Sequence, residues 1–302
     1  MALSRPLRIV LLPLLAVAGV CVLGNMALTT IETVRRHLRG LHPQRVPVDR
    51  AAGQAALGEI RDVSFVTSDG LTLRGWYRPS RNRAAVILMH GGGAARGAVL
   101  PEASMLAPRG YGLLLFDFRA HGESEGDTCT WGGLEQLDLV AALDYLVQQP
   151  DVDPERIGVL GQSFGGSPAI SVAAKDHRIQ AVVAEGTAPT LRERIALDSG
   201  DSRWFTTAPS VWAVGREISL EAAQPVRHVC AIAPRPVLII SGDYAYDQPE
   251  EMARGLFDAA CEPKEYWQIV GAPHAQYARF AANEMEQKLV RFFAGTLLEA
   301  RR

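Results

Sequence analysis

The longest apolar stretch of the chain runs from Ile9 to Leu28 and contains no charged residue. As a helix it would be about 30 Å long, which is the thickness of the hydrocarbon core of a bilayer. A secretory signal has a shorter apolar core and a small-x-small cleavage site, which Asn25-Met26-Ala27 fits poorly. The pattern therefore favours residues 1–36 as an uncleaved, single-span transmembrane anchor over a cleaved signal.

Arginines flank this segment on both sides, at Arg5, Arg8, Arg35, Arg36 and Arg39. The side of the membrane on which the rest of the chain lies is therefore open. Residues 37–58 contain Pro43 and Pro47 and show no clear periodicity. We interpret them as a linker that holds the following domain off the bilayer. The alternative is an irregular strap packed along that domain.

After residue 58 the pattern changes to short strand-like runs that alternate with helical spacing. Two alternating runs, 63–67 and 71–77, flank a turn sequence and predict a β-hairpin. Continuous apolar runs predict buried strands at 85–89 and 111–117. Further strands are predicted at 157–160, 179–184, 236–240 and 265–270. Helical spacing predicts helices at 97–108, 131–149, 249–260 and 279–298. Residues 59–302 are thus predicted to form one α/β domain with a mostly parallel, doubly wound sheet.

Residues 187–232 interrupt this alternation and carry Trp204, Phe205 and Trp212 among charged residues. We predict a small helical cap here, inserted over the carboxyl edge of the sheet. Its aromatic residues then either line a pocket for an acyl or alcohol group or pack the cap onto the sheet.

Composition and charge narrow the class of protein. The 302 residues are 48% apolar and 21% charged, as in globular proteins, and the net charge of -2 without a basic cluster argues against nucleic acid as a partner. The four cysteines show no C-x-x-C spacing, which argues against a zinc site. We interpret Cys230 and Cys261 as buried free thiols, with one bridge between them as the alternative.

The strand predicted at 157–160 ends in Gly161-Gln-Ser-Phe-Gly165, a G-x-S-x-G sequence. Glycines two positions either side of a serine let the following helix return close to the strand, so that the hydroxyl projects from a strained turn. Ser163 is therefore the candidate nucleophile. A serine hydroxyl needs a base to take its proton, and His274, just after the last predicted strand, is the candidate.

A carboxylate that orients the histidine should follow the strand 236–240. We favour Asp247, because it is far enough past the strand end for its loop to reach His274. Asp243 is nearest the strand and could serve only to cap the turn. Glu250, in the same loop, and Glu185, at the tip of the preceding strand, remain alternatives.

His90-Gly-Gly-Gly93 follows the strand 85–89. We predict that its backbone approaches Ser163, so that the N–H groups of Gly92 and Phe164 form an oxyanion hole. A phosphate-binding loop would require a following G-K-[ST] sequence, which is absent. We expect the polar run 117–124, His121 included, to be mostly structural.

Together, the sequences around His90, Asp117, Ser163 and His274 resemble those of the α/β-hydrolase superfamily. The run from Asp62 to Trp76 also resembles bacterial membrane-tethered serine hydrolases of the dienelactone-hydrolase and serine-aminopeptidase-like branches. The resemblance spans residues 60 to 298. It implies a triad of Ser163, an acid and His274, and no cofactor.

The function that this resemblance implies is hydrolysis of a carboxylic ester or related acyl bond in a small-molecule substrate, at a bacterial inner membrane. One alternative is an aminopeptidase-like amide hydrolase. Another is a hydrolase-fold protein that binds without turnover, because Ala245 stands where many relatives carry an aspartate.

Overall fold

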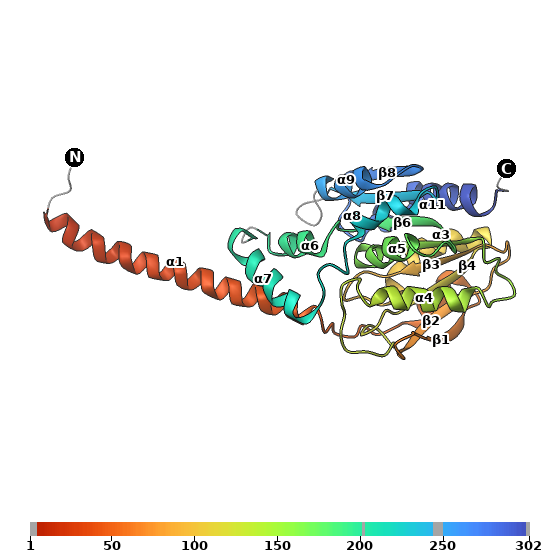
Figure 1. Cartoon of the computed structure of the whole chain (residues 1–302), viewed down its shortest axis with the longest axis horizontal. Helices are drawn as coiled ribbons and strands as arrows, with labels where there is room; N and C mark the ends of the chain where they lie inside the picture. Colours follow the sequence, from red (N-terminus) through yellow and green to blue (C-terminus); the bar gives the residue numbers. More distant parts are fainter. Residues whose placement is uncertain (1–4, 201–202, 244–249, 300–302) are drawn as a thin grey trace.

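The computed structural model describes residues 5–200, 203–243 and 250–299, and of these the side chains from residue 14 onward except that of residue 250. Within this part of the chain, eight strands form one sheet in the order β1-β2-β4-β3-β5-β6-β7-β8 (Figure 1). They are β1 (Arg61–Val66), β2 (Thr72–Arg78), β3 (Ala85–Met89), β4 (Gly112–Phe116), β5 (Ile157–Gln162), β6 (Ile179–Glu185), β7 (Val237–Gly242) and β8 (Lys264–Ile269). Strand β2 runs antiparallel to both neighbours, and all other adjacent pairs are parallel. The predicted hairpin and the α/β fold class are confirmed.

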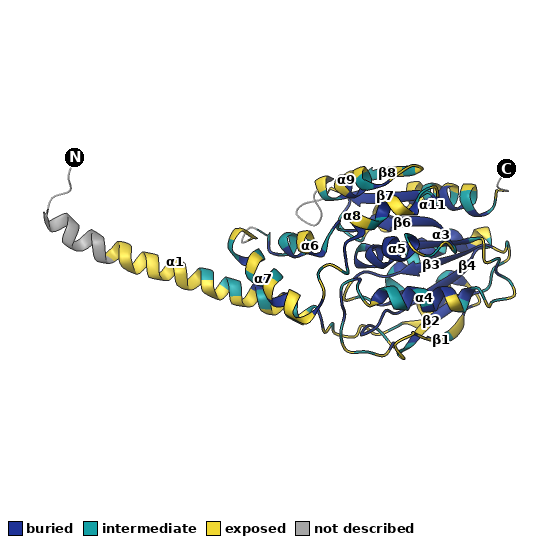
Figure 2. Ribbon diagram, viewed as in Figure 1, coloured by how far each residue is buried: buried dark blue, intermediate teal, exposed yellow. Residues whose placement is uncertain are grey.

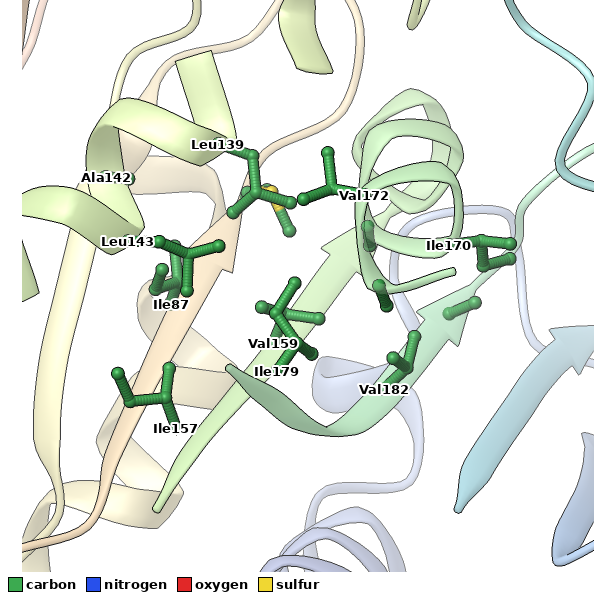
Figure 3. Close-up of a cluster of buried hydrophobic side chains, with 14 of the residues drawn as sticks. Ile87, Leu139, Ala142, Leu143, Ile157, Val159, Ile170, Val172, Ile179 and Val182 are labelled. Carbon is green, nitrogen blue, oxygen red and sulfur yellow. The ribbon is translucent and has the colours of Figure 1, made fainter. Parts of the chain in front are cut away.

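Helices cover both faces of the sheet. One face packs against α4 (Glu135–Leu146), α5 (Gly166–Ala173), α8 (Pro225–His228) and α9 (Glu250–Ala259). The other packs against α2 (Arg50–Leu57), α3 (Leu100–Leu106), α10 (Tyr277–Phe280) and α11 (Ala282–Leu297). Figure 3 shows branched side chains of β3, β5 and β6 interlocking with those of α4 and α5. Such a packed core holds the carboxyl ends of the strands, and the loops that follow them, in fixed positions.

The N-terminal helix α1 (Arg5–Arg39) projects away from this domain (Figures 1 and 2). From Leu14 onward it includes an 18-residue window with a mean hydropathy of 2.0, none of which is buried. By length and composition it is able to cross a membrane.

The segment predicted as a linker is instead a strap packed on the domain. Leu41 and Leu57 are buried, and Arg45 donates hydrogen bonds to the carbonyls of Gly122 (3.0 Å) and Gly126 (2.7 Å). Helix α2 begins with Asp49, whose carboxylate accepts the N–H groups of the first turn. The prediction failed because the apolar contacts of this segment are single residues, which leave no periodic pattern.

The interpretation of Cys230 and Cys261 as free thiols is wrong, because the structure joins them in a disulfide with a Cα–Cα distance of 4.5 Å. Cys230 precedes β7 and Cys261 precedes β8. Because these strands are parallel neighbours, the segments that lead into them lie at the same edge of the sheet. The free cysteines of the described residues are Cys21 and Cys129.

The insertion 187–232 forms the predicted helical cap, with α6 (Leu191–Asp198), α7 (Arg203–Glu217), α8 and a short 3-10 turn at Val229–Ile232. Its small core contains Leu191, Ile195, Val214 and Ile218, together with Leu41, which follows the N-terminal helix. The cap therefore packs against the chain segment at the end of α1.

Candidate active site

Ser163 occupies the turn between β5 and α5, and its φ of +53° lies in the left-handed region. This conformation is uncommon for a residue with a β-carbon. The turn closes only because its flanking residues are glycines. A β-carbon at Gly161 would lie 2.3 Å from the Gly165 carbonyl oxygen, and one at Gly165 would lie 2.8 Å from the His90 oxygen. The G-x-S-x-G spacing thus produces the strained turn that steric reasoning predicts.

His274 lies in the loop after β8, and its Nε2 is 2.8 Å from Oγ of Ser163. The two residues are 111 positions apart, so the sheet brings them together. Gly186, after β6, makes room for the imidazole, because a β-carbon there would lie 2.9 Å from Nδ1. The arrangement allows His274 to take the proton of the Ser163 hydroxyl.

The candidate acids have different surroundings in the structure. The carboxylate of Asp243 accepts the backbone N–H of Gly271, which fits a turn-capping role. Glu185 is fully buried, and among the residues that the structure describes neither of its carboxylate oxygens has a hydrogen-bond partner. Asp247 lies outside the described residues, and Glu250 begins α9 with its side chain also outside them.

Glu185 points to the α3 face of the sheet, since its alternate neighbours Ala181 and Val183 belong to the core on that side. Burial raises its pKa well above the usual value, and the nearby Glu102 raises it further. Burial also raises the pKa of Glu102 to about 7. These two carboxyl groups form a buried pair beneath the active site and do not orient His274.

Two buried histidines fix the loop 90–93. Nδ1 of His90 lies 2.7 Å from the Gly91 carbonyl oxygen, and its Nε2 accepts the N–H of Phe118 at 3.1 Å. Nε2 of His121 accepts the N–H of Gly93, also at 3.1 Å. Burial lowers the pKa of both rings, that of His90 to about 3, so both are neutral at physiological pH.

This loop lies beside Ser163, the candidate nucleophile. A β-carbon at Gly91 would lie 3.5 Å from Cβ of Ser163, and one at Gly92 would lie 3.7 Å from Cβ of Phe164. Gly92 and Phe164, the predicted oxyanion donors, are therefore neighbours, on the side of Ser163 where the loop after β3 passes.

The polar run 117–124 is structural, as expected. Both carboxylate oxygens of Asp117 are occupied, by Arg96 and by the N–H of Glu123. Arg119 forms ion pairs with Asp138 (2.7 Å) and Asp69 (2.8 Å). These contacts tie the loop after β4 to α4 and to the turn between β1 and β2.

A small pocket of about 40 Å³ opens beside Ser163, between the sheet and the cap. Phe164, Trp131, Leu191 and Arg194 are among the residues that line it. The hydroxyl of Ser167, which also lines it, is buried and makes no hydrogen bond to any described part of the chain. Trp204 and Trp212 neither line this pocket nor pack the cap onto the sheet, because both are exposed on α7.

Trp131 is a site residue that the sequence analysis missed. It has a φ of +53° and packs edge-to-face on Phe164, with ring centroids 5.9 Å apart. Glu135 holds this loop by accepting the N–H groups of Thr130 and Gly132. The only signal in the sequence was the Gly132-Gly133 pair, which indicates a tight turn.

Trp131 also lines a larger groove, of about 770 Å³, between the end of α1 and the loop 90–93. Arg36, Gly40 and Gly92 are among its other lining residues. The described residues contain no group of three or more His, Cys, Asp or Glu side chains able to hold a metal ion.

Comparisons with known proteins agree with this fold. A family described as the alpha/beta hydrolase fold matches residues 84–228. The chain is 32% identical over 213 residues to the protein YfhR of Salmonella typhi, covering 68% of this chain and 72% of YfhR. It is 29% identical over 283 residues to the protein MT2364 of Mycobacterium tuberculosis, covering 93% and 94% of the two chains.

Among solved structures, the esterase Pf2001 of Pyrococcus furiosus superposes with a TM-score of 0.72 and 25% identity, covering 85% of this chain and 98% of the esterase. A puromycin-hydrolyzing peptidase of Mycobacterium tuberculosis superposes with a TM-score of 0.65 and 20% identity, covering 82% of this chain and 41% of the peptidase. At that identity the second match concerns the fold alone.

Proposed function

This chain belongs to the α/β-hydrolase superfamily and is a hydrolase, and we propose that it is a membrane-anchored serine hydrolase that cleaves a carboxylic ester through an acyl-enzyme. The observation that carries the proposal is the 2.8 Å distance between His274 Nε2 and Ser163 Oγ on a strained turn. The similarity to an esterase at 25% identity supports the ester as the scissile bond.

In the proposed mechanism, Ser163 Oγ attacks the ester carbonyl carbon while His274 Nε2 takes the hydroxyl proton. The N–H groups of Gly92 and Phe164 stabilise the oxyanion. His274 then returns the proton to the leaving alcohol as the carbon–oxygen bond breaks. Water attacks the acyl-enzyme with the same proton transfers, releasing the acid and restoring Ser163.

Asp247 is the proposed partner that orients the imidazole. Its loop leaves β7 at Gly242, and a β-carbon at Gly242 would lie 2.1 Å from the Ala272 carbonyl oxygen. The loop thus departs directly beside the segment that carries His274. Of the three alternatives, Asp243 accepts the N–H of Gly271 and Glu185 makes no hydrogen bond to a described residue, which supports Asp247, while the side chain of Glu250 lies outside the described residues.

We propose α1 as the membrane anchor, with the catalytic domain on the exported side. Disulfides persist in oxidising compartments and are rare in the cytosol, so the Cys230–Cys261 bridge supports this side. Arg5 and Arg8 would then lie at the cytoplasmic end of the helix and Arg35, Arg36 and Arg39 at the exported end, so the disulfide and not the arginine count carries this orientation.

The test is labelling with a fluorophosphonate probe, which reacts with activated serines. The wild type should be labelled, and Ser163→Ala and His274→Ala should not. Labelling of His274→Ala at the wild-type rate, or no labelling of the wild type, would favour a binding protein without turnover. Turnover of p-nitrophenyl esters but not of aminoacyl p-nitroanilides would separate the esterase from the aminopeptidase alternative.

A further inference from the structure

Helix α7 leaves two large aromatic side chains exposed on the outer surface of the cap. Trp204 is 74% and Trp212 is 67% exposed. The opposite, buried face of the same helix carries the small residues Thr206, Ser210 and Ala213. Folding in water favours the reverse arrangement, because aromatic residues gain most from burial. The outer face of α7 is therefore suited to a contact outside the chain.

Helix α7 packs beside the end of α1 (Figure 1). The covered face of α1 begins at Met26 and continues at Thr30, Thr33 and His37, with the spacing of one helix face. From Met26 to Arg39 the helix is about 20 Å long, and the 15 residues of α7 span about 22 Å. Because Met26 belongs to the apolar stretch, α7 starts at the level where α1 would leave the hydrocarbon core.

The exposed face of α7 also carries positive charge. It contains a groove of about 750 Å³ whose lining includes Arg192, Arg203, Arg216 and both tryptophans. The described residues that line it include no carboxylate. The guanidinium of Arg216 lies 5.2 Å from the ring centroid of Trp212. Tryptophans concentrate at the headgroup level of membranes, and arginines near the surface bind acidic lipids.

We propose that this face of α7 docks on the headgroup layer of the bilayer that α1 crosses, with the phosphate of an acidic phospholipid in the groove rimmed by the three arginines. The proposal rests on the membrane anchor proposed above. It makes the cap a second membrane contact, which fixes the orientation of the Ser163 pocket relative to the bilayer.

The test uses the full chain reconstituted in vesicles of phosphatidylcholine and phosphatidylglycerol whose acyl chains are brominated near the headgroup, where bromine quenches nearby tryptophans. The chain has five tryptophans, so Trp204→Phe with Trp212→Phe isolates the two of interest. We expect bromolipid to quench the wild type and the double variant to lose at least half of that quenching. The matched control, Trp267→Phe on β8, should retain it.

A second arm measures lipid preference. Arg203→Gln with Arg216→Gln should reduce the quenching in vesicles rich in phosphatidylglycerol to the level seen in pure phosphatidylcholine, while Arg291→Gln on α11 should not. Equal quenching of the wild type and the double arginine variant in both vesicles would overturn the phosphate site.

Carbonate extraction of the same vesicles reports the anchor separately. If the chain resists extraction and the tryptophan pair contributes no quenching, the docking surface is wrong and the anchor stands. If the chain is extracted and unquenched, both are wrong. If Trp204→Ser with Trp212→Ser converts a dimer into a monomer and leaves quenching unchanged, the face binds a second copy instead.

Discussion

The indole ring of Trp131 lies directly against Gly40, at the end of the N-terminal helix. A β-carbon at Gly40 would lie 3.1 Å from Cζ2 of the ring, and one at Gly92 would lie 3.3 Å from Cζ3. One side chain thus connects the end of α1 with the predicted oxyanion loop. It also forms the wall between the small pocket at Ser163 and the larger groove beside α1.

Trp131→Ala should therefore change the preference for acyl chain length. Removing the ring would join the pocket of about 40 Å³ to the groove of about 770 Å³. Because each methylene in an apolar pocket is worth about 1–3 kcal/mol, we expect kcat/KM for p-nitrophenyl decanoate relative to butyrate to rise at least about 10-fold. Trp131→Phe, which keeps an aromatic wall, should stay near the wild type. An unchanged ratio in Trp131→Ala would show that the ring does not limit the acyl site.

Exchange of the candidate acids should identify the triad carboxylate. Asp247→Asn is expected to lower kcat by about 10³–10⁴-fold, because the imidazole loses the charge that fixes its tautomer and stabilises its protonated form. Asp243→Asn and Glu185→Gln should change kcat much less, since Asp243 caps Gly271 and Glu185 faces α3. Steady-state kinetics on one ester substrate measures all three. If Glu185→Gln lowers kcat strongly and Asp247→Asn does not, the triad acid is Glu185 and not Asp247.

The predicted oxyanion hole is tested at Gly92. Gly92→Pro removes the N–H donor and should lower kcat by about 10²–10³-fold, as loss of one such donor costs about 3 kcal/mol. Gly92→Ala keeps the N–H, and its β-carbon would meet Trp131 at 3.3 Å, a contact that a small shift relieves. It is the matched control and should retain most of the wild-type kcat. Similar losses in both variants would point to a packing defect.

Much of the fold could be predicted because its central strands are mostly apolar runs. The segment 85–89 is fully buried along its whole length, which leaves a continuous pattern that no exposed strand produces. The strained turn at Ser163 was also predictable, because it demands Gly161 and Gly165 around the serine, and so was the position of His274 just after the last strand. Both features follow from local steric requirements and from the order of the residues along the chain.

The rest depends on contacts between distant segments. The Cys230–Cys261 bridge requires that β7 and β8 be neighbours, which spacing along the chain does not state. The packing of Leu41 under the cap needs the cap itself to be placed first. Trp131 reaches the active site only through a loop that Glu135 holds, and a lone tryptophan in a sequence gives no such indication.

The buried pair of Glu102 and Glu185 should make stability depend on pH. Burial raises the folded-state pKa of Glu102 to about 7, above its unfolded value of about 4.3. The folded state then binds more protons, so stability is full below about pH 4.3 and falls as pH rises toward 7. Glu102→Gln should thus leave Tm unchanged at pH 4 and raise it at pH 8, where the free energy of unfolding should increase by up to about 4 kcal/mol. The exposed Glu59→Gln is the control, and equal pH profiles of Glu102→Gln and the wild type would contradict the assignment.

The disulfide should stabilise the part of the domain that carries the acid loop. The bridge closes a loop of 31 residues that includes β7, α9 and the segment with Asp247. Cross-linking a loop of this length lowers the conformational entropy of the unfolded chain, which stabilises the folded state by about 3–4 kcal/mol. Cys230→Ser with Cys261→Ser should therefore lower the urea midpoint of unfolding, and added reductant should lower that of the wild type to the same value. Cys21→Ser in α1 should match the wild type.

Labelling of Cys230 and Cys261 by a maleimide in intact, unreduced cells would instead place both thiols in a reducing compartment and contradict the exported side.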